Sequence, residues 1–248
     1  MASKAFKDSS PLAEAYERWR ESTLGQITDR LQQQALTALI GDVDGLRVLD
    51  VGCGDGVLAV ELAKRGGIVT GLDPDPTMLQ AARARALREG IILALEQGEA
   101  GALPFSDVAF DRVVAVTALC FIPDPEQSIA EMARVLRPGG RLIVGELGRW
   151  NVWAAQRRIQ GWMGNSVWRH ARFRTASELR HLVARQGLTA SETRGATFYP
   201  PSGAAASRLA AIDPWLGRRT TLGAAFIVQA AEKGRSVKCC PQPFSSEE

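Results

Sequence analysis

Between residues 47 and 145 the sequence alternates short apolar runs with segments of helical length. Apolar runs of about five residues are typical of strands buried on both faces. Strands that alternate with helices predict a parallel sheet covered on both faces, with right-handed crossovers. We predict strands at Arg47–Val51, Ile68–Leu72, Ile91–Glu96, Phe110–Val116 and Arg141–Gly145, and helices at Val57–Arg65, from Pro76 onward and at Gln127–Leu136.

The segments on either side of this alternation follow different patterns. Before it, apolar residues at helical spacing predict two helices, the second over Gln26–Ile40. After Gly148, a stretch rich in tryptophan and arginine is predicted to be helical and to lead into a helix at Ala176–Arg185. Two later β-like runs, Leu188–Phe198 and Ala224–Ala231, suit a strand pair that closes one edge of the same sheet. We therefore predict one α/β domain with an inserted helical cap.

The charge balance and the cysteines exclude several classes of protein. The 30 basic and 27 acidic side chains leave a formal net charge of +3, which is too small to indicate a nucleic-acid partner. The N-terminal segment has no apolar core of a secretory signal, and no apolar run is long enough to span a membrane. The four cysteines, of which Cys239 and Cys240 are adjacent, do not resemble a disulfide framework, and no metal site is expected. We expect a cytoplasmic protein with reduced thiols.

A glycine-rich loop, Asp50-Val51-Gly52-Cys53-Gly54-Asp55-Gly56, follows the first predicted strand. Ligands of open parallel sheets bind at the carboxyl ends of the strands. Closely spaced glycines let the backbone turn tightly and approach a ligand, while the next helix directs its N-terminus at it. The glycines alone are compatible with many nucleotide cofactors.

The residues around the glycines discriminate between these cofactors. A dinucleotide-binding loop needs glycine or alanine at the position of Val57, and a phosphate-binding P-loop needs a lysine that this loop lacks. Carboxylates at Asp50 and Asp55 would repel a pyrophosphate and favour an ammonium or sulfonium group. Asp73, at the end of the second strand, is placed to accept hydrogen bonds from ribose hydroxyls. S-adenosylmethionine has a ribose and a cationic amino-acid tail without a phosphate, and it satisfies these demands.

Four motifs follow one another along the chain. They are Val48-Leu49-Asp50-Val51-Gly52-Cys53-Gly54-Asp55-Gly56, Gly71-Leu72-Asp73-Pro74, Ala102-Leu103-Pro104-Phe105 with Phe110-Asp111, and Arg134-Val135-Leu136-Arg137-Pro138-Gly139-Gly140. In this order and spacing they resemble the class I methyltransferases, and within them the branch that includes quinone-ring and other small-molecule methyltransferases. The resemblance covers roughly residues 10 to 148.

The resemblance implies a fold and a division of the chain. The fold is α/β and Rossmann-like, with a doubly wound, mostly parallel sheet of seven strands, the last antiparallel, plus N-terminal helices and a helical cap. Residues 1–45 would form lid helices and residues 46–148 the S-adenosylmethionine-binding core. Residues 149–233 would supply the substrate cap and the closing strands of the same domain, and residues 234–248 a disordered tail.

The resemblance also implies roles for residues around the methionine part of the cofactor. Gly52, Gly54 and Gly56 would border this part, and Asp50 would lie near its amino group. Thr117, just past the fourth strand, would face both the methionine part and the acceptor.

Other residues are implied around the nucleoside. Asp73 would hold the ribose, and Pro74 and Met78 would line the adenine pocket. In the segment Gly98-Glu99-Ala100 the acid would meet the exocyclic amine of adenine, where many relatives have aspartate. Tyr16 would close over the cofactor as a lid. The residues predicted to bind the cofactor are Tyr16, Asp50, Gly52, Cys53 (through its backbone), Gly54, Asp55, Gly56, Asp73, Pro74, Met78, Gly98, Glu99, Ala100 and Thr117.

Structural interpretations compete with these roles. Asp50 could cap the loop backbone, Asp73 could be a turn residue, and Glu99 could be a solvated loop acid. Tyr16 and Trp19 could belong to the core alone.

The predicted function is in-line methyl transfer to a small-molecule acceptor. The methyl donor is already activated, so alignment and exclusion of water are the main demands on the protein, and no catalytic residue is assigned. The acceptor atom and the number of subunits are left open. Two other classes compete: a non-catalytic S-adenosylmethionine-binding scaffold subunit and a nicotinamide-dependent oxidoreductase, against which Val57 and the paired acids argue.

Overall fold

The computed structural model describes residues 18–235. Several predicted features lie outside this range: Tyr16, most of the first predicted helix, Cys239, Cys240 and nearly all of the predicted tail.

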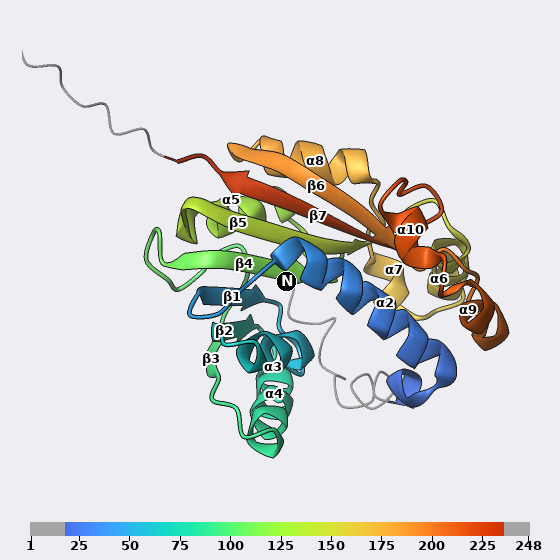
Figure 1. The fold of residues 1–248 in the computed structure, drawn as a ribbon, viewed down its shortest axis with the longest axis horizontal. Coiled ribbons are helices and arrows are strands. Elements are labelled where there is room, and N and C mark those ends of the chain that lie inside the picture. Colours follow the sequence, from blue (N-terminus) through green and yellow to red (C-terminus); the bar gives the residue numbers. More distant parts are fainter. Residues whose placement is uncertain (1–17, 236–248) are drawn as a thin grey trace, which may run out of the picture.

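A single seven-stranded sheet forms the centre of the protein, in the order β3-β2-β1-β4-β5-β7-β6 (Figure 1). Strands β1 to β5 pair in parallel, and β7 runs antiparallel to both β5 and β6. The Rossmann-like sheet with an antiparallel last strand is therefore confirmed. The strands are β1 Arg47–Val51, β2 Ile68–Asp73, β3 Ala94–Gln97, β4 Phe110–Val116, β5 Leu136–Leu147, β6 Leu188–Ala196 and β7 Phe226–Lys233.

Helices cover both faces of the sheet, because successive strand residues point to opposite sides. Leu49 faces the core that α5 and α8 cover, whereas the preceding Val48 faces the core beneath α2 and α3. The two cores together bury most of the apolar surface of the strands, as the continuous apolar runs predict. The helices on these faces are α2 Thr23–Ile40, α3 Val57–Lys64, α4 Pro76–Arg88, α5 Pro125–Val135 and α8 Ala176–Ala184.

Four further helices surround the end of the sheet where the parallel strands finish. They are α6 Val152–Trp162, α7 Ser166–His170, α9 Gly203–Leu209 and α10 Asp213–Gly217 (Figure 1). Trp153 of α6 donates its indole N–H to the carbonyl oxygen of Tyr199 at 2.7 Å, and the Tyr199 hydroxyl lies 3.0 Å from Oγ1 of Thr28 on α2. These contacts join the cap to α2. Within residues 18–235, no helix is both long and apolar enough to cross a membrane.

Three details differ from the sequence prediction. Strand β3 begins at Ala94 rather than Ile91, and Ile92 is almost fully exposed. Strand β5 begins at Leu136 rather than Arg141 and includes residues 138–140, because extra residues bulge between the Phe110–Leu136 and Arg112–Arg141 pairs. Helices α9 and α10 were not predicted.

The topology places the glycine-rich loop after β1 at the point where the order of the strands reverses. Chain connections run from β1 to β2 on one side and return to β4 on the other. The loops after β1, β2 and β4 therefore meet at one edge, where ligands of such sheets bind.

Candidate cofactor site

The backbone of the glycine loop adopts conformations that favour glycine at three positions. Gly52, Gly54 and Gly56 have φ angles of +73°, +54° and +77°, a region that side chains make costly. The loop is held against β2, since the N–H groups of Gly52 and Cys53 both donate to the carbonyl oxygen of Leu72, at 2.7 and 3.0 Å. This turn brings the end of β1 beside the end of β2.

The space around the three glycines is not the same. A Cβ atom added at Gly52 would lie 2.8 Å from Cβ of Ala118, and one added at Gly56 would lie 2.8 Å from Cβ of Ala82. A Cβ atom at Gly54 would meet no protein atom within 4 Å. Gly52 and Gly56 thus allow close packing of the loop, whereas the backbone at Gly54 borders open space that a ligand can approach.

Two buried carboxylates lie beneath this loop. Asp50 is 2% exposed, and its Oδ2 has no hydrogen-bond partner among residues 18–235. Burial, and secondarily the charge of Asp73, raise the pKa of Asp50 to about 7. An unpartnered buried carboxylate oxygen calls for an explanation, and a cationic ligand group supplies one.

Asp73 is bound by the backbone. Its Oδ2 accepts from the N–H of Gly54 at 2.9 Å, and its Oδ1 accepts from the N–H of Asp75 at 3.0 Å. Burial raises the pKa of Asp73, while these two backbone hydrogen bonds act in the opposite direction. Each carboxylate oxygen retains a second lone pair that can accept from a ligand hydroxyl.

Asp55 differs from Asp50 because its charge is already paired. Its Oδ2 lies 2.8 Å from Nη2 of Arg20 and 2.7 Å from Nη2 of Arg85, and Nε of Arg85 donates to its carbonyl oxygen. Of the two loop acids, Asp50 is therefore the one whose charge is left to attract a cationic ligand. Asp55 joins the loop to α4 and to the helical turn at residues 18–21, and its predicted contact with the cofactor stays a prediction.

Thr117 follows β4 in a conformation that is rare for a β-branched residue. Its φ is +53°, and its N–H donates to the carbonyl oxygen of Gly145 at 2.7 Å. The next residue, Ala118, packs against Gly52. The loop after β4 therefore lies beside the glycine loop, and its strained first residue belongs to the same edge of the sheet.

A family model described as "Methyltransferase domain" matches residues 49–144. Methyltransferase GfsG of Streptomyces halstedii is 40% identical over 140 residues, which are 55% of this chain and 46% of that protein. A ubiquinone biosynthesis O-methyltransferase of Alkalilimnicola ehrlichii is 40% identical over 111 residues, 44% of this chain and 45% of that protein. The chain thus spans about half the length of these two curated relatives.

A solved structure resembles almost the whole chain. It is a SAM-dependent methyltransferase of Thermotoga maritima, described as a possible histamine N-methyltransferase, with a TM-score of 0.73 and 28% identity. The similarity covers 92% of this chain and 98% of the other. Residues 49–144 therefore form a methyltransferase domain, and the chain as a whole is similar to a class I S-adenosylmethionine-dependent methyltransferase.

The remaining predicted residues are distributed around the ends of two strands, β2 and β3. The N–H of Gly98, after β3, donates to the carbonyl oxygen of Asp73 at 3.2 Å, which places that segment beside the end of β2. Glu99 and Pro74 are exposed, and Met78 on α4 is half-buried. Their predicted roles around the nucleoside stay predictions.

The thiol of Cys53 packs against the sheet. A Cβ atom built on Gly71 of β2 would lie 2.9 Å from Sγ of Cys53. Burial raises the pKa of this thiol above its ordinary value. Because its thiol packs against the sheet, Cys53 would contact the cofactor through its backbone, as the sequence predicts.

A buried ion pair that was not predicted from the sequence lies at the carboxyl end of β5. Glu146 is fully buried, and its Oε2 lies 3.5 Å from Nη1 of Arg174, which also donates to the carbonyl oxygen of Leu119 at 3.2 Å. Burial raises the pKa of Glu146 to about 7. A single acid within the apolar run of β5 was the signal that could have identified it.

Proposed function

We propose that this chain transfers a methyl group from S-adenosylmethionine to a small-molecule acceptor. The observation that carries the proposal is the buried Asp50 carboxylate, which has an unpartnered oxygen beneath a glycine loop open at Gly54. A cationic amino-acid tail fits this combination of charge and space, and a pyrophosphate does not.

The methionine part of the donor would be held by the glycine loop. Asp50 would accept a hydrogen bond from its ammonium group, and the backbone at Gly54 would lie against it. Thr117 would face the same part of the donor from the loop after β4.

The nucleoside part would extend toward β2 and β3. Asp73 would accept from the ribose hydroxyls with the lone pairs that the backbone leaves free. Pro74, Met78 and the segment Gly98-Glu99-Ala100 would surround the adenine, and Tyr16 would cover the donor.

The protein's part in the reaction would be positional. When bound, the donor supplies an electrophilic methyl carbon on a sulfonium. The loop after β4 and the cap helices would align the acceptor with that carbon and exclude water from the site. No general base is assigned.

Aromatic residues of the cap and of the loop after β4 support a small, partly apolar acceptor. The rings of Phe121 and Trp168 lie with centroids 6.4 Å apart, and Trp153 and Phe173 are buried close to the same helices. The similarity to a ubiquinone biosynthesis O-methyltransferase favours the same class of acceptor.

Calorimetry with S-adenosylmethionine, S-adenosylhomocysteine and NAD tests the cofactor. We expect both sulfur ligands to bind and NAD not to bind, and Asp73→Ala to weaken both sulfur ligands. Glu61→Gln, an exposed acid on α3, is the control and should bind as the native protein does. The proposal is wrong if the native protein binds neither sulfur ligand.

A thermal-shift screen of acceptors in saturating S-adenosylhomocysteine tests the catalytic part. Compounds that stabilise this complex are then incubated with S-adenosylmethionine, and methylated product is sought by mass spectrometry. A protein that binds the donor but methylates none of the stabilising compounds would favour the non-catalytic scaffold.

A further inference from the structure

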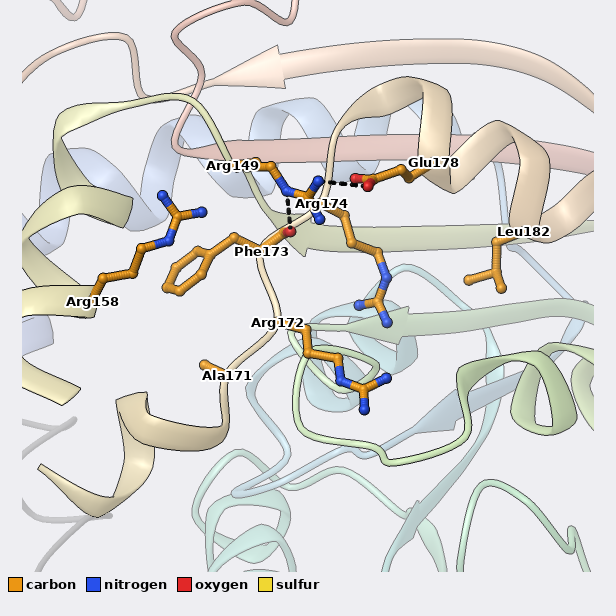
Figure 2. A pocket seen from close by; sticks show the side chains of 8 residues that line it. All are labelled: Arg149, Arg158, Ala171, Arg172, Phe173, Arg174, Glu178 and Leu182. Carbon is orange, nitrogen blue, oxygen red and sulfur yellow. Dashed lines mark hydrogen bonds and ion pairs between the residues drawn. The ribbon is translucent and has the colours of Figure 1, made fainter. Parts of the chain in front are cut away.

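A pocket of about 540 Å³ lies where β5, α6 and α8 approach one another, and arginines dominate its wall (Figure 2). Arg149 follows β5, Arg158 belongs to α6, and Arg172 and Arg174 precede α8. Arginines from three separate segments thus line one hollow of a size typical of ligand sites.

Two of these arginines are paired with carboxylates. Nη1 of Arg149 lies 2.7 Å from Oε1 of Glu178, and its Nε donates to the carbonyl oxygen of Phe173 at 3.0 Å. Arg174 lies beside the buried Glu146. Figure 2 shows the Arg149 contacts at the upper rim of the pocket.

The other two arginines have no carboxylate partner within residues 18–235. The guanidinium carbon of Arg158 lies 5.0 Å from the ring centroid of Phe173, a contact that orients the group and leaves its charge uncompensated. The side chain of Arg172 is exposed and makes no hydrogen bond or ion pair with the described part of the chain. The pocket therefore carries two unbalanced positive charges.

Backbone contacts hold the arginine segment in place. The N–H of Arg172 donates to the carbonyl oxygen of Cys120 at 2.8 Å, and Nη1 of Arg174 donates to that of Leu119. Both acceptors belong to the loop that begins at Thr117. The pocket is thus built on the loop that borders the candidate cofactor site, which fixes the backbone at Arg172 and the guanidinium of Arg174.

We propose that this pocket binds the phosphate group of a small molecule. A phosphate monoester carries a charge of about −1.5 to −2 at neutral pH and three acceptor oxygens, which matches the two uncompensated guanidinium groups. The planar donor fork of arginine suits such oxygens, often through two parallel hydrogen bonds. The inference goes beyond the proposed methyl transfer and does not depend on it, since phosphate binding is measured without the methyl donor.

Calorimetric titration of the full chain with inorganic phosphate and with phenyl phosphate tests the site. We expect saturable binding at one site, weakened about tenfold or more in Arg172→Gln and in Arg158→Gln, because each substitution removes a charge-assisted hydrogen bond. Arg180→Gln, which removes an exposed arginine of α8 outside the pocket, is the matched control and should bind as the native protein does. Unchanged thermal unfolding midpoints would show that the variants are folded.

Three outcomes would overturn the proposal. The first is the absence of saturable phosphate binding by the native protein. The second is an equal loss in Arg180→Gln, which would indicate diffuse attraction by surface charge. The third is binding of acetate as tight as that of phosphate, which would assign the pocket to a carboxylate.

A repeat of the titration in saturating S-adenosylhomocysteine identifies the source of the phosphate. Tighter phosphate binding in that complex would support the site and assign the phosphate to the methyl acceptor, held beside the donor. Unchanged binding would support the site and assign it to a separate phosphate-bearing ligand.

Discussion

Asp50 and Asp73 are neighbouring carboxylates with different hydrogen bonding. Asp73 accepts from two backbone N–H groups, whereas one oxygen of Asp50 has no partner within the described range. Burial opposes the charge of both side chains and raises both pKa values. Asp50 is therefore the residue whose ionisation a cationic ligand would change most.

We expect the affinity for S-adenosylmethionine to fall as the pH drops below 7. An ammonium group needs ionised Asp50, whose pKa in the free protein is about 7. Each pH unit below that value should cost up to about a factor of ten in affinity. In Asp50→Asn this pH dependence should disappear, and at pH 8 binding should be weaker by about tenfold or more, because a charged hydrogen bond is lost.

Calorimetry between pH 5.5 and pH 8.5 measures the pH dependence of donor binding, because this range spans the pKa of about 7. Asp42→Asn, an exposed acid before β1, is the control and should keep the native profile. An Asp50→Asn variant with native affinity and native pH dependence would contradict the role of Asp50.

Gly52 and Gly54 should respond differently to replacement by alanine. Both have positive φ angles, which should cost either variant about 1 kcal/mol of stability. The new methyl group at position 52 would also meet Ala118 at 2.8 Å, so Gly52→Ala should lose about 1–3 kcal/mol more. Gly54→Ala places its methyl group in open space and should weaken donor binding more than it weakens the fold.

Urea unfolding and donor calorimetry on the two variants separate these effects. Equal loss of stability in both would contradict the packing role of Gly52. Native donor affinity in Gly54→Ala would show that the open space at that glycine is not the cofactor site.

Helix α8 begins with a reciprocal pair of hydrogen bonds between Thr175 and Glu178. The N–H of Glu178 donates to Oγ1 of Thr175 at 3.2 Å, and the N–H of Thr175 donates to Oε2 of Glu178 at 2.7 Å. Thr175→Ala should lower the free energy of unfolding by about 1 kcal/mol, since the cap satisfies N–H groups that the helix leaves unpaired. Ser177→Ala, at an exposed position in the same turn, should change it by less than about 0.5 kcal/mol. Equal effects of the two substitutions in urea unfolding would exclude the capping role.

Across the whole molecule, local patterns were predictable and long-range charge pairs were not. Periodicity and glycine placement predicted the alternation of strands and helices and the loop after β1, because those features depend on neighbouring residues. The seven-stranded sheet with an antiparallel last strand followed from the family resemblance. The partners of Asp55 lie on other elements, at Arg20 and Arg85, and the partner of Glu146 is Arg174. No spacing rule connects such residues before the fold brings them together. Helices α9 and α10 were missed because they have only 7 and 5 residues. Such short helices do not show a periodic apolar pattern in the sequence.

Buried acids should also make the stability of the whole protein depend on pH. The pKa values of Asp50 and Glu146 are raised to about 7 by burial, so between about pH 4 and pH 7 the folded state holds protons that the unfolded state releases. The contribution of each group to stability is present at low pH and is lost as the pH rises through about 7. Asp50→Asn removes one such group without changing its shape, so at pH 8 the variant should be more stable than the native protein, by about 1–3 kcal/mol. At pH 4 the two proteins should be nearly equal in stability, because Asp50 is protonated there.

Urea unfolding at the two pH values, with Asp42→Asn as the control, measures the difference in stability. A native advantage at pH 8 would mean that a partner within the chain, rather than a ligand, compensates the charge of Asp50.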